Sequence, residues 1–238
     1  EIGGADGERA VESLNQQKPK TGVYPVLVDE RISSRLNGHV LGEEKGAYVE
    51  GGSTWAKDLL GKQVVQEGMA KKEDPHRVRA NGSRPFDGEG LATSKRAIVQ
   101  DGVLQGWTLD LASARKLGMA PTGNAARGIS GPPSPATWNV ALTQGQHSRA
   151  DLIRDMGTGI LVTSMIGSTI NSNTGDYSRG AAGFWVENGT IQYPISGITI
   201  AGNLIDMLQR IVPANDARLH LSNIVPSLLI DGLTIAGS

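Results

Sequence analysis

Short apolar runs, many of them alternating with polar residues, recur along the chain and are separated by glycine-containing turns. Residues 96–107 and 174–194 each hold two such runs joined by a two-residue turn, Asp101-Gly102 in the first and Asn188-Gly189 in the second. Asp-Gly and Asn-Gly favour the positive φ angles of a type I′ turn. Both stretches therefore predict β-hairpins.

The end of the chain predicts a third hairpin, in which residues 228–230 and 233–235 flank Asp231-Gly232. Three such turns imply antiparallel pairing, because parallel neighbours need crossovers of a dozen or more residues. Further strands are predicted at 23–28, 64–65, 137–142, 160–163 and 196–203, with irregular structure over 62–85 and a long loop over 121–139.

Helical patterns occur singly between the hairpins. Predicted helices cover 8–14, 30–40 after an N-cap at Asp29 and before Gly42, 53–60 after Ser53 or Thr54, 109–117 before Gly118, 149–156 after Ser148, and 204–211 before Pro213. The pattern as a whole predicts an α+β fold, with a large and mostly antiparallel sheet built from hairpins and single helices between them.

The first half of 174–194 is rich in glycine, which predicts a strand entered through a loop where another backbone comes close. Polar residues lie among these glycines. Asp176 and Arg179 suit either a functional loop or an ordinary structural ion pair, and the sequence leaves both interpretations open.

Composition limits the classes of function. The chain has 238 residues, of which 38% are hydrophobic and 20% charged, as in a globular protein with a sizeable core. A formal net charge of -1 gives no electrostatic basis for binding nucleic acid or an anionic membrane. No apolar run is long enough to span a bilayer. We expect a cytoplasmic protein and, because the chain starts at Glu1 without methionine, the C-terminal part of a longer polypeptide.

Familiar catalytic motifs do not occur in the sequence. Cysteine is absent, which excludes disulfides and thiolate ligands. The four histidines, at positions 39, 76, 147 and 220, lack the spacing of a zinc-binding helix. Glycine-rich pieces match neither a P-loop nor a dinucleotide fingerprint.

Several segments together resemble a known family. They are TGDYSRGAAGFWVENGTIQYP at 174–194, LNGHVLG at 36–42, LLGKQV at 59–64, RPFDGEG at 84–90, SARKLG at 113–118 and SNI at 222–224. Taken in their order along the chain, they resemble the C-terminal part of the PmbA (TldE) branch of the TldD/PmbA family, first described as modulators of DNA gyrase. The resemblance implies a linker with a helix over 1–22 and the family's C-terminal domain over 23–238, without the family's N-terminal domain.

The resemblance also implies a two-subunit zinc peptidase system that processes or degrades small peptides and unfolded polypeptides. In its TldD-type subunit, zinc is bound by the histidines of an HExxxH helix and by a cysteine, and the glutamate is the general base. Here Asp29 and Ser34 replace the histidines, Glu30 retains the glutamate, and the cysteine position falls at 224–226, where no ligand exists. A carboxylate and a hydroxyl suit zinc poorly. We therefore expect no catalytic residue, metal or cofactor in this subunit, and zinc in a TldD-like partner.

Three functions follow as hypotheses. The leading one is a non-catalytic subunit that forms a heterodimer with a TldD-like chain and helps to enclose a peptide or unfolded polypeptide, a homodimer also being possible. Its candidate substrate or partner surface is Asp176, Tyr177, Ser178 and Arg179. The alternatives are a self-standing metallopeptidase, with an unrecognised site built from His39, His147, His220, Asp29 or Glu30, and a protein that binds gyrase directly without contacting nucleic acid.

Overall fold

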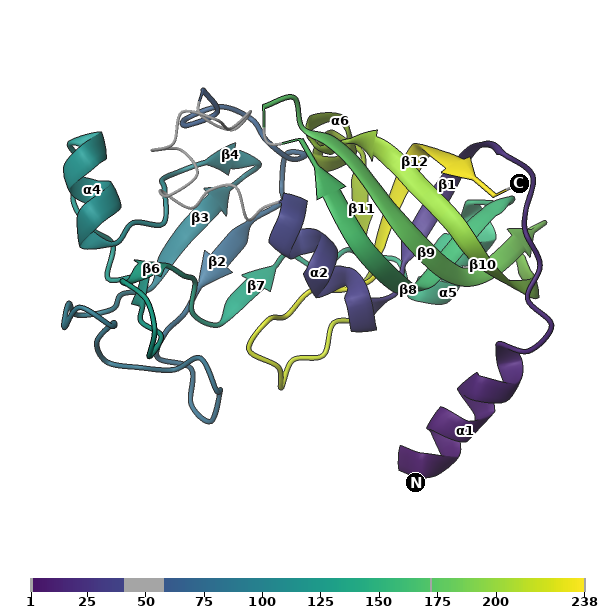
Figure 1. The fold of residues 1–238 in the computed structure, drawn as a ribbon, viewed down its shortest axis with the longest axis horizontal. Coiled ribbons are helices and arrows are strands. Elements are labelled where there is room, and N and C mark those ends of the chain that lie inside the picture. Colours follow the sequence, from purple (N-terminus) through teal and green to yellow (C-terminus); the bar gives the residue numbers. More distant parts are fainter. Residues whose placement is uncertain (1, 41–57, 172, 238) are drawn as a thin grey trace.

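A six-stranded sheet that curls into a closed barrel is the largest element of the computed structural model, which describes residues 2–40, 58–171 and 173–237 (Figure 1). Its strands, in sheet order, are β1 (Gly22–Val28), β8 (Gly159–Ile170), β9 (Asp176–Glu187), β10 (Thr190–Asn203), β12 (Leu228–Ala236) and β11 (Ile211–Pro213). The barrel closes because β1 pairs with β8 along one edge and with β12 along the other.

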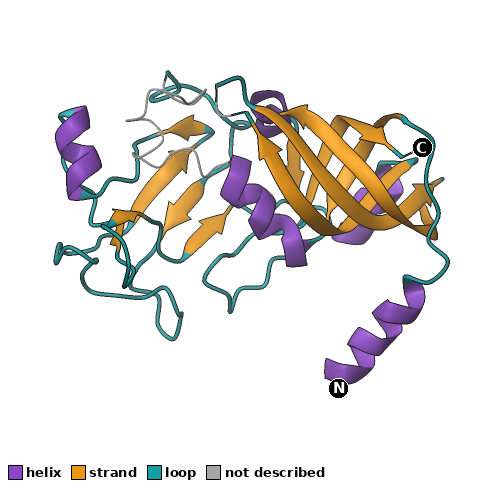
Figure 2. Ribbon diagram, viewed as in Figure 1, coloured by secondary structure: helices purple, strands orange, loops and turns teal. Residues whose placement is uncertain are grey.

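A second, smaller sheet forms a lobe beside the barrel (Figure 2). Its strands, in order, are β4 (Val103–Leu104), β3 (Arg96–Gln100), β2 (Lys71–Glu73) and β7 (Val140–Leu142), and β5 (Ala125–Ala126) pairs separately with β6 (Ser134–Pro135). The predicted large sheet is present as the barrel, but the predicted hairpin at 96–107 belongs to the smaller sheet. Strand β2 escaped prediction because its buried residues are charged: Lys71 is 3% and Glu73 2% exposed.

The α+β class is confirmed, whereas the description as antiparallel hairpins holds only in part. Among the described strands, β1 and β8 form one parallel pair, with Val26 opposite Ile160 and Val28 opposite Val162. A parallel pair needs a long connection. Here residues 29–158 supply it, and they contain the whole second sheet.

Two of the predicted hairpins are confirmed. Asp101 and Gly102 have φ angles of 50° and 77°, and Asn188 and Gly189 have 51° and 70°, as a type I′ turn requires. The second hairpin joins β9 to β10 and supplies much of the barrel wall. The predicted close approach of backbone is found at Gly183, where a Cβ atom would overlap the carbonyl of Leu161 on β8.

The third predicted hairpin is wrong, because β12 runs without reversal from Leu228 to Ala236. Asp231 and Gly232 form a bulge instead: Tyr24 lies opposite Leu233 and Val26 opposite Ile230, so that two residues of β12 face Pro25 alone. Gly232 alone takes a positive φ, of 74°. The bulge absorbs the extra residue where Pro25 has no N–H group to offer the ladder.

The helices largely follow the predicted signals. They are α1 (Ile2–Glu12), α2 (Glu30–Val40), α4 (Leu111–Leu117), α5 (Arg149–Asp155) and α6 (Leu204–Gln209). Asp110 caps α4 and Gly118 ends it in the left-handed region, while Ser148 and Asp151 form a capping box on α5. In the described part of the chain, no helix is long and apolar enough to cross a membrane.

Two helix predictions need correction, and two others fall mostly or wholly outside the described residues. Helix α1 begins at Ile2 and ends at Glu12 rather than covering 8–14. Helix α6 ends at Gln209, and Ile211 belongs to β11, where pairing with β12 buries it and overrides the helical spacing. Most of the predicted helix at 53–60 lies outside the described residues, and its last three residues, 58–60, are not helical. The predicted helix end at Gly42 also lies outside the described residues.

The second half of strand β1, residues 26–28, is buried on both faces, which explains its continuous apolar sequence. Val26 and Val28 point into the barrel core, whereas Leu27 packs on the outer side against Leu152 and Ile153 of α5. All three strand residues are at most 1% exposed. A strand covered on both sides needs no polar alternation.

Segments far apart in the sequence meet at the end of β1. The strand leads directly into α2, and Leu228 at the start of β12 pairs with Val28, which brings the preceding segment, 214–227, alongside. Helix α5 precedes β8, the parallel neighbour of β1, and its first residue, Arg149, reaches the same end of the barrel. This convergence places charged side chains from three segments around one spot.

Candidate functional site

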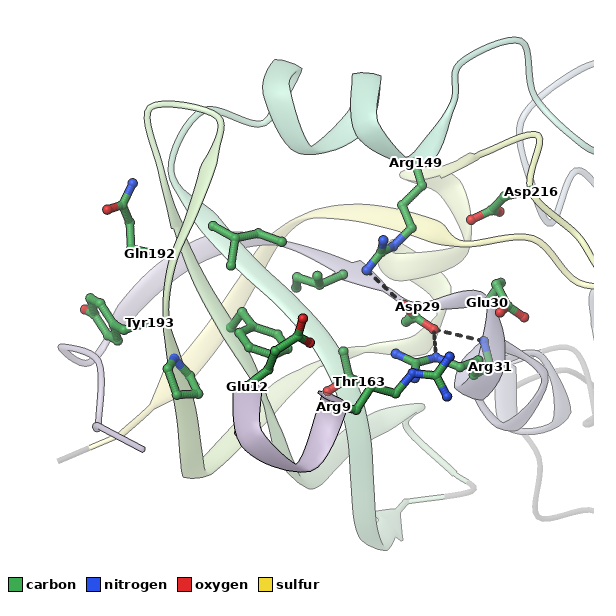
Figure 3. Close-up of a pocket in the computed structure, with 14 residues that line it drawn as sticks. Arg9, Glu12, Asp29, Glu30, Arg31, Arg149, Thr163, Gln192, Tyr193 and Asp216 are labelled. Atoms are coloured by element: carbon green, nitrogen blue, oxygen red, sulfur yellow. Dashed lines mark hydrogen bonds and ion pairs between the residues drawn. The ribbon is translucent and has the colours of Figure 1, made fainter. Parts of the chain in front are cut away.

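A cleft of about 660 Å³ lies where these segments converge (Figure 3). The starts of α2 and α5 form one side, strands β8 and β9 form the floor, and the β9–β10 hairpin and α1 form the rest. The lining residues are Arg9, Glu12, Asp29, Glu30, Arg31, Arg149, Leu161, Thr163, Phe184, Ile191, Gln192, Tyr193, Pro194 and Asp216.

Asp29 is the most enclosed acid of the cleft, at 3% exposure. One carboxylate oxygen accepts hydrogen bonds from the backbone N–H and the Nε of Arg31, at 3.2 and 2.6 Å, and the other lies 3.1 Å from Nη2 of Arg149. Figure 3 shows the two arginines reaching Asp29 from different helices. Burial raises the pKa of Asp29, but the hydrogen bonds from Arg31 and the charges of Arg149 and Arg31 outweigh burial and hold it below the ordinary 3.8.

Glu30 is occupied by a different arginine. Its carboxylate lies 2.6 Å from Nε of Arg218, a residue of the segment that precedes β12. The backbone N–H of Glu30 donates to Oγ of Ser227, at 3.0 Å. Ser227 is held in turn by Asp216, whose carboxylate accepts from its N–H and its hydroxyl, both at 2.7 Å. The retained glutamate is thus one end of a fixed polar chain.

The segment that corresponds to the missing cysteine lies against α2, where the resemblance would place it. The hydroxyl of Ser33 donates to the carbonyl of Val225, at 3.2 Å. Ser34, one residue further along α2, is half-buried. The motif positions are therefore close in space, although the residues at them differ from those of a zinc site.

The family's zinc does not fit these residues. Zinc requires imidazole, thiolate or carboxylate donors that are free to bind it, but Asp29 already holds two guanidinium groups and Glu30 holds one. Two unit positive charges 4 Å apart repel by roughly 4 kcal/mol at the effective dielectric of a protein surface. Among the described residues, no three acids or histidines are grouped so as to hold a metal ion.

The structure describes the side chains of two of the three histidines of the alternative metal site. His147 and His220 are exposed, and neither lines the cleft. His39 belongs to α2, but its side chain lies outside what the structure describes. This ligand set receives no support from the described part of the chain.

The residues at 176–179 also lie away from the cleft, at the start of β9. Asp176 is exposed and its carboxylate accepts from Thr174 and Asn203, contacts that lower its pKa. Tyr177 is buried in the barrel core, where burial raises its pKa. Asp176 thus has neutral partners rather than Arg179, and the role of this segment as a partner surface stays a prediction.

Sequence reasoning missed most of the charged residues in the cleft. Arg149, Asp216 and Arg218 come from segments more than 110 residues beyond Asp29, and an isolated arginine or aspartate gives no local signal of its partner. Ser148, however, was predicted as the cap of α5, and that cap places Arg149 at the helix start. The β9–β10 turn was also predicted, and the two strands that it joins carry Phe184, Ile191 and Tyr193, the apolar side of the cleft.

Comparisons with known proteins agree with the family resemblance found in the sequence. The sequence model of a family described as the PmbA/TldA metallopeptidase C-terminal domain matches residues 21–237. The chain is 43% identical to Metalloprotease PmbA of Escherichia coli O157:H7 over 237 residues, which cover 98% of this chain and 50% of that protein. It therefore spans about half the length of the curated relatives it matches.

Solved structures share the fold. A Bacteroides thetaiotaomicron protein provisionally described as a modulator of DNA gyrase superposes with a TM-score of 0.87 at 34% identity, covering 99% of this chain and 52% of that one. TldE from Thermococcus kodakarensis superposes with a TM-score of 0.83 over 97% of this chain and 55% of that one; at 24% identity this likeness concerns the fold alone.

Proposed function

Because the chain belongs to the TldD/PmbA metallopeptidase family, we propose that it is part of a non-catalytic, PmbA (TldE)-like subunit of a zinc peptidase. The subunit pairs with a TldD-like chain in the cytoplasm and helps to hold small peptides or unfolded polypeptides for cleavage. The zinc and the general base belong to the partner. In this chain, residues 23–238 form the family's C-terminal domain, and the helix that precedes it adds Arg9 and Glu12 to the cleft.

The observation that carries the proposal is the state of Asp29. In a zinc peptidase, the acids and histidines at this place must be free to bind a dication, whereas here two guanidinium groups neutralise the one buried carboxylate. The carboxylate of Glu30 is paired with Arg218, whose Nε lies 2.6 Å away, and this pairing competes with a role as general base. The charges of the cleft are already balanced by the chain itself.

The rest of the cleft suits a binding role. Its volume of about 660 Å³ lies within the usual range of small-molecule and peptide pockets. Phe184, Ile191 and Tyr193 give it an apolar side, and the arginines and acids give it a polar side. A peptide presents both kinds of surface.

Reconstitution tests the proposal. The full-length protein is mixed with a purified TldD-like chain, and association and cleavage of an unfolded polypeptide are measured together. We expect no cleavage by this protein alone, a complex at micromolar concentration, and faster or altered cleavage by the complex. Glu30→Gln in this protein does not abolish that activity, whereas the same change in the partner's motif does. A protein that stays alone and leaves the partner's activity unaffected contradicts the proposal.

A further inference from the structure

We propose that Arg31 and Arg149 form a binding site for the terminal carboxylate of a peptide in the cleft. This inference rests on the proposed peptide-binding role and names the group of the peptide that is recognised. Arginine suits this task because its planar guanidinium presents five N–H donors that match a carboxylate.

The first step is the number of donors at Asp29. Two guanidinium groups share a single carboxylate, and the recorded contacts use Nε of Arg31 and Nη2 of Arg149. The Nε of Arg149 is buried without a hydrogen-bond partner. One carboxylate has too few lone pairs for two complete guanidinium groups. A second carboxylate would use the donors that remain.

The second step is the local charge. At the carboxylate of Asp29 two guanidinium groups face one negative charge, while Glu30 is paired with Arg218. Asp216, which keeps its charge although it accepts from Ser227, and Arg9 also line the cleft, so this excess is confined to Asp29 and its two partners. Glu12 of α1 also lines the cleft and attracts Arg31. Glu12 is an exposed side chain on an exposed helix, so water screens its attraction for Arg31 and a ligand's carboxylate can displace it.

The third step is the apolar surface beside the arginines. Leu161 and Phe184 form the floor of the cleft, and Ile191 lies on the hairpin wall with 43% of its surface exposed. Pro194 on the same wall has no N–H group to offer a ligand. A carboxylate next to an apolar side chain is the chemistry of a peptide that ends in a residue such as leucine. A free inorganic anion would use only the arginines.

Calorimetric titration of the purified full-length protein tests the inference. The probes are acetyl-Ala-Ala-Ala-Leu with a free terminal carboxylate, the same peptide as its terminal amide, and inorganic phosphate. We expect the free acid to bind at least about tenfold more tightly than the amide, equivalent to about 1.4 kcal/mol. Arg31→Gln and Arg149→Gln each remove most of this difference. Asp29→Asn tightens binding of the acid, because it releases donors of both arginines.

Arg154→Gln is the matched control, because it removes the same charge from the same helix, α5, at a side chain that is 67% exposed and pairs with Asp151. It leaves the difference between acid and amide intact. Equal binding of acid and amide, or a preference that survives both cleft substitutions, overturns the inference, and so does phosphate that binds as tightly as the peptide acid. Association with the TldD-like chain is measured in the same samples. An unaltered protein that forms the complex but binds acid and amide equally contradicts only this inference, whereas one that binds the acid selectively but does not associate contradicts only the proposed function.

Discussion

Neutralising the carboxylate of Asp29 by Asp29→Asn gives the sharpest test of how the charged cluster is held. The change keeps the size of the side chain and an oxygen that accepts from the N–H of Arg31, but it leaves two guanidinium groups without their shared anion. Removing one partner of a fully buried ion pair costs about 3–5 kcal/mol. The side chains of Arg31 and Arg149 are 30% and 37% exposed, so water screens part of this cost. We expect a loss of about 2 kcal/mol, the size of a hydrogen bond to a charged group.

The dependence on pH separates a charge effect from a packing effect. Because the folded-state pKa of Asp29 lies below its ordinary 3.8, the carboxylate contributes stability that is fully present above that pH and is lost as the pH falls through the folded-state pKa. Urea unfolding of the parent protein and of Asp29→Asn should show the full difference in free energy of unfolding at neutral pH. This difference should shrink below about pH 4. A variant within about 0.5 kcal/mol of the parent at neutral pH, or a difference that stays constant into acid, would refute the reasoning.

Three further substitutions and one control, Gly180→Ala, test the frame around the site, each by urea unfolding. Gly183→Ala should cost about 3 kcal/mol, because its Cβ would overlap the carbonyl of Leu161, whereas Gly180→Ala, whose Cβ would lie 3.3 Å from the nearest carbonyl oxygen, should cost less than about 1 kcal/mol. Ser227→Ala should cost about 2 kcal/mol, because it orphans buried partners in the polar chain behind α2, and an unchanged midpoint would exclude that chain as a stabilising element. Gly232→Ala should cost about 1–2 kcal/mol if the residue sits at a bulge with positive φ; a neutral result would speak against the bulge.

How far the sequence determines the fold depends on the range of the interaction concerned. The Asn188-Gly189 turn and the Ser148 cap are local, and both were predicted correctly from a few neighbouring residues. Barrel closure is not local: it turns Asp231-Gly232 into a bulge because β1 runs opposite both halves of β12. The same long-range pairing draws Ile211 out of the expected helix and into β11.

The candidate site also combines features that the local sequence reveals with features that depend on long-range contacts. Asp29, Glu30 and Ser34 were singled out because they occupy the positions of a known motif, and the structure places Asp29 and Glu30 in the lining of a cleft. What occupies the acids was not predictable, since Arg149 and Arg218 lie 120 and 188 positions away from Asp29 and Glu30 in the sequence. Only the folded chain brings these charges together. The sequence alone predicts a site that lacks zinc ligands. In the folded chain, guanidinium groups occupy the place that a metal ion would take beside the acids.

Metal analysis tests this central claim most directly. The full-length protein is exposed to excess zinc, freed of unbound metal by gel filtration, and its zinc content is measured by mass spectrometry beside that of a TldD-like chain treated in the same way. The account predicts stoichiometric zinc in the TldD-like chain and no stoichiometric zinc in this protein. One zinc per chain that disappears in Asp29→Asn or Glu30→Gln would contradict it.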